Sequence, residues 1–217
     1  MARNKNPEET VNLILNVSQR LFIEKGYEHT SIQDIIDQLG GLSKGAIYHH
    51  FSSKEDILNA VITRMSEESE IKLGKILERK DLNGKEKLRC IFTESVNRDV
   101  QEGVFSAAPN LGQNPQLMSL IIRDSIEVVT PEYILPIIEE GIRDGSIKTD
   151  YPKELAEIIM LIGNVWMNPM VFDSSPEETV RKFQFFQDMM KALGVDVIDG
   201  ELAERLRKLT VIYQKNK

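Results

Sequence analysis

Residues 40–58, GGLSKGAIYHHFSSKEDIL, decide the fold of this chain because they contain the start and stop signals of consecutive helices. Gly40 and Gly41 lack a Cβ atom, so they can adopt the positive φ angles of a tight turn between helices. Ser43 is a favourable N-cap for a short helix that continues through Phe51. The segment therefore predicts a tight turn followed by a short third helix.

Helical patterns lie on both sides of that turn. Apolar residues at helical spacing predict a first helix over residues 8–25, and Thr30 or Ser31 is suited to cap a second one. Ser52 and Glu55 have the spacing of a capping box that begins a longer fourth helix. Two short helices that follow a longer one and are joined by a glycine turn form a helix-turn-helix within a three-helix bundle.

The third helix has one apolar face and one polar face. Ile47 and Phe51 are four residues apart, so both can point into the bundle. The N-terminus of a helix carries partial positive charge, to which Lys44 adds a full charge, while Gly45 permits close approach of a phosphate. Lys54 offers a second phosphate contact at the start of the next helix. The exposed face presents hydrogen-bond donors, aromatic rings and one small residue: Lys44, Ala46, Tyr48, His49 and His50.

Residues 30–62, TSIQDIIDQLGGLSKGAIYHHFSSKEDILNAVI, resemble the DNA-binding segment of the TetR family (AcrR type) of transcriptional regulators. The resemblance rests on the threonine before the second helix, on Ser-Lys-Gly, on Tyr-His-His-Phe and on Ser-Lys-Glu, and it covers residues 9–65. It implies a helix-turn-helix DNA-binding domain over residues 1–53, although the turn LGGLS is one residue longer than the family's. The residues expected to contact double-stranded DNA are Thr30, Ser31, Ser43, Lys44, Gly45, Ala46, Tyr48, His49, His50 and Lys54.

The remainder of the chain, residues 54–217, is expected to form a larger helical domain that binds an effector and dimerises. Apolar spacing predicts a helix over residues 84–103, and two further helices are expected over residues 115–129 and 131–145. The fold class that follows is all-α, with a long fourth helix that joins the DNA-binding bundle to the larger domain.

Two later helices carry more apolar surface than one buried face needs. Residues 152–168 are apolar nearly all round, and residues 176–193 include phenylalanines on more than one side. They resemble the dimerisation helices of the family, which form a four-helix bundle with a second copy of the chain. A two-fold homodimer also matches a palindromic operator.

An unknown small-molecule effector is implied by the resemblance, and its binding among the helices would release the operator. Any single large apolar residue of this region is more often part of the core than of a pocket. Acidic side chains such as Asp124 could favour a cationic ligand, although solvated helix faces are the commoner role of such residues. The candidate ligand-binding residues are Phe92, Phe105, Met118, Tyr133, Met160 and Trp166.

Composition places the chain among ordinary globular proteins. It has 217 residues, 41% hydrophobic and 28% charged, and no apolar run approaches the roughly 20 residues of a membrane span. No secretory signal is recognisable and Cys90 is the single cysteine, so a cytoplasmic location is expected. The net charge of −7 disfavours DNA weakly, but residues 1–64 hold seven basic and eight acidic side chains and are nearly balanced.

Catalysis and metal binding have little support in the sequence. His49 and His50 are adjacent on a helix and point about 100° apart, with no cluster of other ligands, so no metal and no cofactor is expected. Nucleophile, phosphate-loop and zinc motifs are lacking, so no enzyme activity is expected. The alternative is a helical small-molecule-binding protein or enzyme whose N-terminal bundle does not bind DNA.

Overall fold

The computed structural model describes residues 7–42, 44–97, 99–107, 110–113, 115–197 and 200–215, and every regular element in these ranges is helical. This confirms the all-α expectation. The elements are α1 (Pro7–Lys25), α2 (Ile32–Gln38), α3 (Lys44–His50), α4 (Lys54–Leu77), α5 (Gly84–Asn97), α6 (Asp99–Ala107), η1 (Leu111–Gln113), α7 (Pro115–Asp124), η2 (Ser125–Ile134), α8 (Leu135–Asp144), α9 (Pro152–Leu161), η3 (Ile162–Trp166), α10 (Pro176–Ala192) and α11 (Gly200–Lys215).

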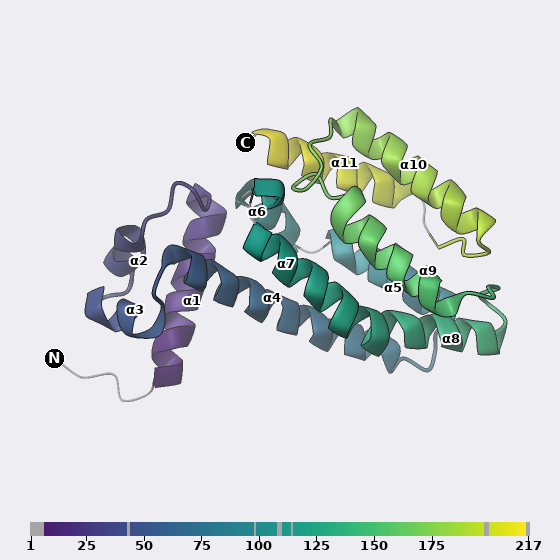
Figure 1. The fold of residues 1–217 in the computed structure, drawn as a ribbon, viewed down its shortest axis with the longest axis horizontal. Helices are drawn as coiled ribbons and strands as arrows, with labels where there is room; N and C mark the ends of the chain where they lie inside the picture. The colour runs from purple at the N-terminus through teal and green to yellow at the C-terminus, as the bar shows by residue number, and fades with distance from the viewer. Residues whose placement is uncertain are drawn as a thin grey trace.

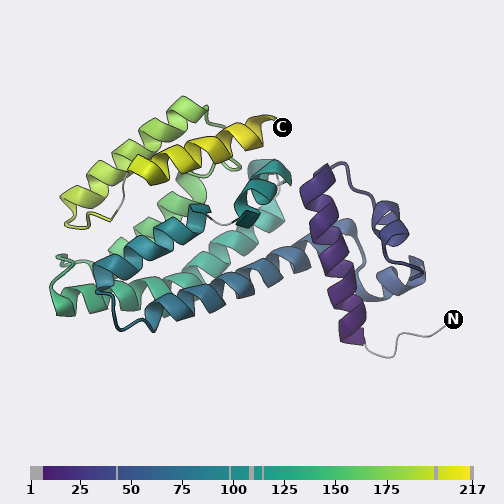
Figure 2. The same ribbon diagram turned by 180° about the vertical axis from the view of Figure 1, so that it is seen from behind.

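A small N-terminal bundle of α1, α2 and α3 stands at one end of the molecule, and α4 leads from it into the larger helical body (Figure 1). Ile14, Ile35, Ile47 and Ile57 come from four different helices and are each fully buried, so they form the centre of the bundle. The same arrangement is visible from behind in Figure 2, where α1 crosses the end of α4.

The turn between α2 and α3 uses both glycines in the left-handed region. Gly40 has φ of 63° and Gly41 has φ of 111°, and neither angle is readily adopted by a residue with a Cβ atom. The longer turn is therefore accommodated by two consecutive glycines, and the buried face of α3 still reaches the bundle through Ile47.

The start of α4 differs by one residue from the expected capping box. Ser53, and not Ser52, is the N-cap, and its hydroxyl accepts a hydrogen bond from the backbone N–H of Asp56. Ser52 instead donates its backbone N–H to the Asp56 carboxylate at 3.0 Å. The carboxylate at this helix start is therefore that of Asp56 and not that of Glu55, because Ser53 takes the N-cap position that was expected for Ser52.

Residues 115–144 form one continuous helical run, so the prediction of two separate helices over residues 115–129 and 131–145 is wrong. The run widens into the π-helical segment η2, which contains Pro131. Proline has no N–H and its ring clashes with the preceding turn of an α-helix, and local widening of the helix relieves both defects. The hydroxyl of Thr130 also donates to the carbonyl of Ser125 at 2.6 Å within this segment.

Helices α5 and α8 pack closely because glycines meet at their contact. A Cβ atom on Gly84 would lie 2.2 Å from the backbone nitrogen of Gly141, so no side chain fits there. Beside this contact the buried ammonium of Lys87, 1% exposed, forms an ion pair with Glu140 at 2.6 Å and donates to the carbonyl of Leu77 at 2.9 Å. These contacts fix α4, α5 and α8 relative to one another.

The last two helices lie side by side on the outside of the body (Figure 1). The apolar side chains of α11 are buried against the body: Leu202, Leu206, Leu209 and Tyr213. By contrast, Phe185 of α10 is 60% exposed, and Ile158 and Leu161 of α9 are 38% and 39% exposed. The larger domain therefore leaves apolar side chains of α9 and α10 in contact with solvent.

Candidate nucleic-acid interface and ligand cavity

Helix α3 presents a mixed aromatic and basic surface that is fixed by its buried side. Ile47 is 0% exposed, whereas Tyr48 is 45% exposed, so consecutive side chains point to the core and to solvent. The Lys44 ammonium lies 5.7 Å from the centroid of the Tyr48 ring, close enough for a cation–π contact. Lys44 is also the only lysine or arginine within α2 and α3.

The other residues predicted on this surface are distributed as follows. Gly45 and His49 are exposed, and Ala46 and His50 are half-buried. The two histidine rings form an edge-to-face pair with centroids 5.0 Å apart. Ser43 lies outside the described residues. The described residues of α3 thus present one cation, three aromatic rings and a small residue together on the side away from the bundle.

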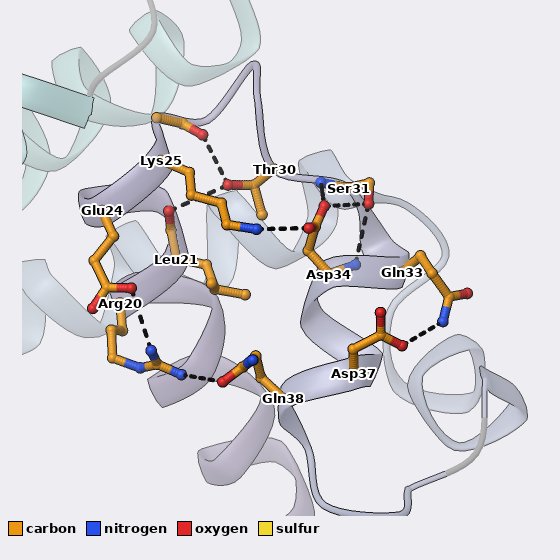
Figure 3. Close-up of polar contacts among 11 residues, drawn as sticks. Arg20, Leu21, Glu24, Lys25, Thr30, Ser31, Gln33, Asp34, Asp37 and Gln38 are labelled. Atoms are coloured by element: carbon orange, nitrogen blue, oxygen red, sulfur yellow. Dashed lines mark hydrogen bonds and ion pairs between the residues drawn. The ribbon is translucent and has the colours of Figure 1, made fainter.

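Ser31 confirms the second-helix cap and is engaged in a tight polar cluster (Figure 3). Its hydroxyl accepts from the backbone N–H of Asp34 at 3.1 Å, and its own backbone N–H donates to the Asp34 carboxylate at 2.9 Å. The ammonium of Lys25 lies 2.7 Å from the same carboxylate. Hydrogen bonds from Lys25 and then from Ser31 hold the pKa of Asp34 well below its usual range.

Thr30 is not at the surface, contrary to the expectation that it contacts DNA. Its side chain is 1% exposed, and its hydroxyl donates to the carbonyl of Gly26 at 2.8 Å and to that of Leu21 at 3.2 Å (Figure 3). Leu21 lies near the C-terminal end of α1, and Gly26 directly follows that helix, beyond which no helical N–H groups continue. Thr30 therefore joins the end of α1 to the start of α2.

Lys54 is also turned toward the protein. Its ammonium donates to the carbonyl of Tyr27 at 2.8 Å and lies 4.2 Å from the centroid of the same ring. Burial, followed by the charges of Glu55 and Glu28, raises the pKa of Tyr27. The expected phosphate contact of Lys54 is thus in competition with an internal contact between α4 and the loop after α1.

A cavity of about 490 Å³ lies in the larger domain and reaches the N-terminal bundle. Its wall is mainly apolar, and α1 contributes Phe22 and Ile23 to it. Helices α4, α5 and α7 contribute further wall residues, as do both π-helical segments. Such a volume is in the range of pockets that bind small organic molecules.

Three of the six predicted ligand-binding residues line this cavity, namely Phe92, Phe105 and Met160. The other three do not. Trp166 packs against Phe185 of α10, with ring centroids 5.8 Å apart, and Tyr133 lies beside Gly74 of α4. Met118 is half-buried against the core. Helical spacing alone does not separate residues facing a cavity from those packing against neighbouring helices.

Asp124, named from the sequence as a possible acidic pocket residue, lines the cavity, but sequence reasoning missed two neighbouring polar residues of its wall. Ser125 and Asn164 line it, and the Asn164 amide donates to the Ser125 hydroxyl at 3.0 Å. An asparagine in the apolar run around residues 158–166 is the signal that was available, since a buried amide requires a partner.

Among the described residues, no group of three or more His, Cys, Asp or Glu could hold a metal ion.

Known proteins match this chain over both the bundle and the body. The family model for "Bacterial regulatory proteins, tetR family" matches residues 14–61. The uncharacterized HTH-type transcriptional regulator YezE of Bacillus subtilis is 31% identical over 158 residues, covering 67% of this chain and 78% of that protein. The HTH-type transcriptional repressor KstR2 of Rhodococcus jostii is 27% identical over 148 residues, covering 66% of this chain and 70% of that protein.

Solved structures show the same fold. A TetR-family transcriptional regulator from Pectobacterium atrosepticum aligns with a TM-score of 0.56 at 20% identity, covering 99% of this chain and 95% of that one. A transcriptional regulator from Cytophaga hutchinsonii aligns with a TM-score of 0.57 at 18% identity, covering 94% of this chain and 96% of that one.

Within the described residues, no helix has the length and hydropathy needed to cross a membrane.

Proposed function

Because this chain belongs to the TetR family of transcriptional regulators, which are not enzymes, we propose that it is a repressor that binds a palindromic operator as a homodimer and releases it when a small molecule binds. Its DNA-binding domain is residues 1–53, and residues 54–217 bind the effector and dimerise. The relative named a repressor, KstR2, supports the direction of regulation.

The observation that carries the proposal is the arrangement of α3. The full burial of Ile47 fixes the helix so that Lys44, Tyr48 and His49 are exposed together. A helix placed in the major groove positions itself with phosphate contacts and reads bases with the side chains that face the groove. Lys44 and Ser31 are suited to phosphates, and Ala46 and Tyr48 to base edges and thymine methyl groups.

The dimer is supported by the exposed apolar side chains of α9 and α10. Phe185 is 60% exposed and contacts Trp166, so an apolar surface extends from α10 to η3. Large exposed apolar surfaces of this kind are typical of interfaces between subunits. A homodimer carries two copies of α3, and to bind a palindrome these two helices need to lie roughly one turn of DNA, or a multiple of it, apart.

Coupling between the cavity and the DNA-binding domain is supported by their direct contact. The cavity wall includes Phe22 and Ile23 of α1, so a ligand would touch the bundle itself. Helix α6 also packs tightly on α1, since a Cβ atom on Gly103 would lie 2.7 Å from the Ile23 side chain. A ligand acts only if it binds the DNA-competent and released states with different affinities.

The proposal is tested by measuring binding of the purified chain to labelled DNA from upstream of its own gene, with scrambled DNA of equal length as the control. Tighter binding to the upstream fragment, and repression of a reporter placed behind it, are expected. Equal and weak binding to both DNAs would instead favour a helical small-molecule-binding protein whose bundle does not read DNA.

A further inference from the structure

A polar corner interrupts the apolar wall of the cavity where the two π-helical segments meet. Ser125, 5% exposed, begins η2 and donates its hydroxyl to the carbonyl of Ile121 at 2.8 Å. Asn164 of η3 donates its amide to the same hydroxyl at 3.0 Å. Both residues line the cavity, so the side-chain oxygen of Asn164 is available near its wall.

Asp124 adds a negative charge directly beside this corner. It is half-buried at the end of α7, lines the cavity, and accepts a hydrogen bond from Ser66 of α4. Among the residues that the structure describes, no lysine or arginine forms an ion pair with it. Burial raises the pKa of Asp124, as expected for a carboxylate that has lost water without gaining a cation.

The other charges near this corner do not neutralise Asp124. Lys72 and Glu94 also line the cavity, but both are exposed and they carry opposite charges. Glu70 lies near enough to Asp124 that its own pKa is raised, chiefly by burial and then by the charge of Asp124. The cavity wall therefore combines apolar side chains with the carboxylate of Asp124, which forms no ion pair with a described lysine or arginine.

Resting on the proposed ligand-responsive function, we propose that the cavity selects a cationic amphiphile, whose ammonium group binds Asp124 and Asn164 and whose apolar body fills the remaining space. An ammonium supplies the charge that the carboxylate lacks and donates hydrogen bonds to the carboxylate and amide oxygens. A neutral ligand would leave the partly desolvated Asp124 without a cation, and an anionic ligand would add repulsion.

The same corner connects ligand binding to α4. Asp124 interacts with Ser66 of α4, and the N-terminal end of α4 lies in the DNA-binding bundle. An ammonium that attracts the carboxylate competes with the Ser66 hydroxyl, so occupancy changes the contact between α7 and α4. Ser66→Ala removes this contact while retaining the carboxylate, and it should leave the charge preference of the ligand intact.

The proposal is tested by calorimetric titration of the full chain, without DNA, with three matched probes below their aggregation concentrations: decylammonium, decanol and decanoate. We expect decylammonium to bind at least tenfold more tightly than decanol, and decanoate to bind most weakly. Equal binding of decylammonium and decanol, tighter binding of decanoate, or no binding of decylammonium would overturn the proposal.

Two variants test whether Asp124 is the source of the preference for decylammonium over decanol. Asp124→Asn keeps the shape of the side chain and should abolish the tenfold preference for decylammonium over decanol. Glu127→Gln removes an exposed carboxylate of η2 that does not line the cavity, and it should retain the preference. A preserved preference in folded Asp124→Asn, as judged by circular dichroism, contradicts the assignment; if that variant does not fold, the three probes on the unmodified chain still decide.

Failure of this inference is distinguishable from failure of the proposed function. Operator binding by the ligand-free chain tests the regulator, and it does not depend on which probe binds. If decanol and decanoate release the operator as well as decylammonium does, the repressor stands and the charge selectivity is wrong. If the chain never distinguishes operator from scrambled DNA, the proposed function fails whatever the calorimetry shows.

Discussion

The ammonium of Lys54 is held by Tyr27, donating to its backbone carbonyl at 2.8 Å and lying 4.2 Å from the centre of its ring. This relationship joins the first turn of α4 to the loop that follows α1. It gives Lys54 a structural role inside the bundle, whereas Lys44 at the start of α3 is exposed. The two lysines, although both begin helices, are therefore expected to contribute to DNA binding in different ways.

Lys44→Ala should weaken binding to every DNA sequence and reduce the slope of log affinity against log salt concentration by about one, because one phosphate contact is lost. Lys54→Ala should change that slope less and should lower the free energy of unfolding by about 1 kcal/mol, because a cation–π contact and a hydrogen bond are removed. Affinity measured over a series of salt concentrations, together with denaturant unfolding, separates the two effects. A full unit of slope lost in Lys54→Ala, with unchanged stability, would show that this lysine leaves Tyr27 for the DNA.

Asp34→Asn should lower the stability of the N-terminal bundle at neutral pH, because the carboxylate accepts hydrogen bonds from Lys25 and Ser31. The pKa of Asp34 is lower in the folded chain than its ordinary value. Its ionised form therefore stabilises the fold above about pH 4, and this contribution is lost as the pH falls further toward the folded-state pKa.

Denaturant unfolding at several pH values checks this linkage. The difference in stability between the unmodified chain and Asp34→Asn should be largest at neutral pH and should shrink in the acid range. Asp37→Asn is the matched control, since Asp37 is an exposed carboxylate of α2 that accepts from Gln33 and takes no part in the cap. A difference that is constant with pH would mean that the asparagine disturbs packing instead of charge.

Phe185→Glu should dissociate the proposed dimer, because it places a charge on the exposed apolar surface of α10. Light scattering at micromolar concentration should give about twice the 24.8 kDa chain mass for the unmodified protein and a lower mass for the variant. Ile71→Glu is the control: Ile71 is 61% exposed but belongs to α4, and not to α9 or α10. A monomer for the unmodified chain, or equal dissociation of both variants, would contradict the proposed interface.

The start signals of the helices were predictable because they are local. The cap of α2 depends on Ser31 and a carboxylate three residues later, and the tight turn depends on Gly40 and Gly41. The N-cap of α4 is Ser53 and not the predicted Ser52, because two adjacent serines both fit the sequence pattern of a helix cap. Choosing between them requires the position of Asp56, which is set by packing of α4.

The continuous helix through Pro131 and the cavity wall could not be predicted in the same way. Proline normally ends a helix, and only the widened η2 segment, anchored by Ser125 and Thr130, allows the chain to continue. Trp166 does not line the cavity; its ring contacts Phe185, a residue of another helix. Contacts between distant parts of the chain cannot be predicted from hydrophobic periodicity, because that pattern describes one helix at a time.

The central claim, that the exposed side of α3 reads the operator, is tested most directly by the ratio of operator to random-DNA affinity for Tyr48→Ala, with Ile47→Val as the adjacent control. At one fixed salt concentration, Tyr48→Ala should lose about 1–3 kcal/mol on the operator and much less on random DNA. Ile47→Val should lower the free energy of unfolding by about 1 kcal/mol and leave the ratio unchanged, because Ile47 is fully buried. A ratio that falls in Ile47→Val and is preserved in Tyr48→Ala would contradict the account.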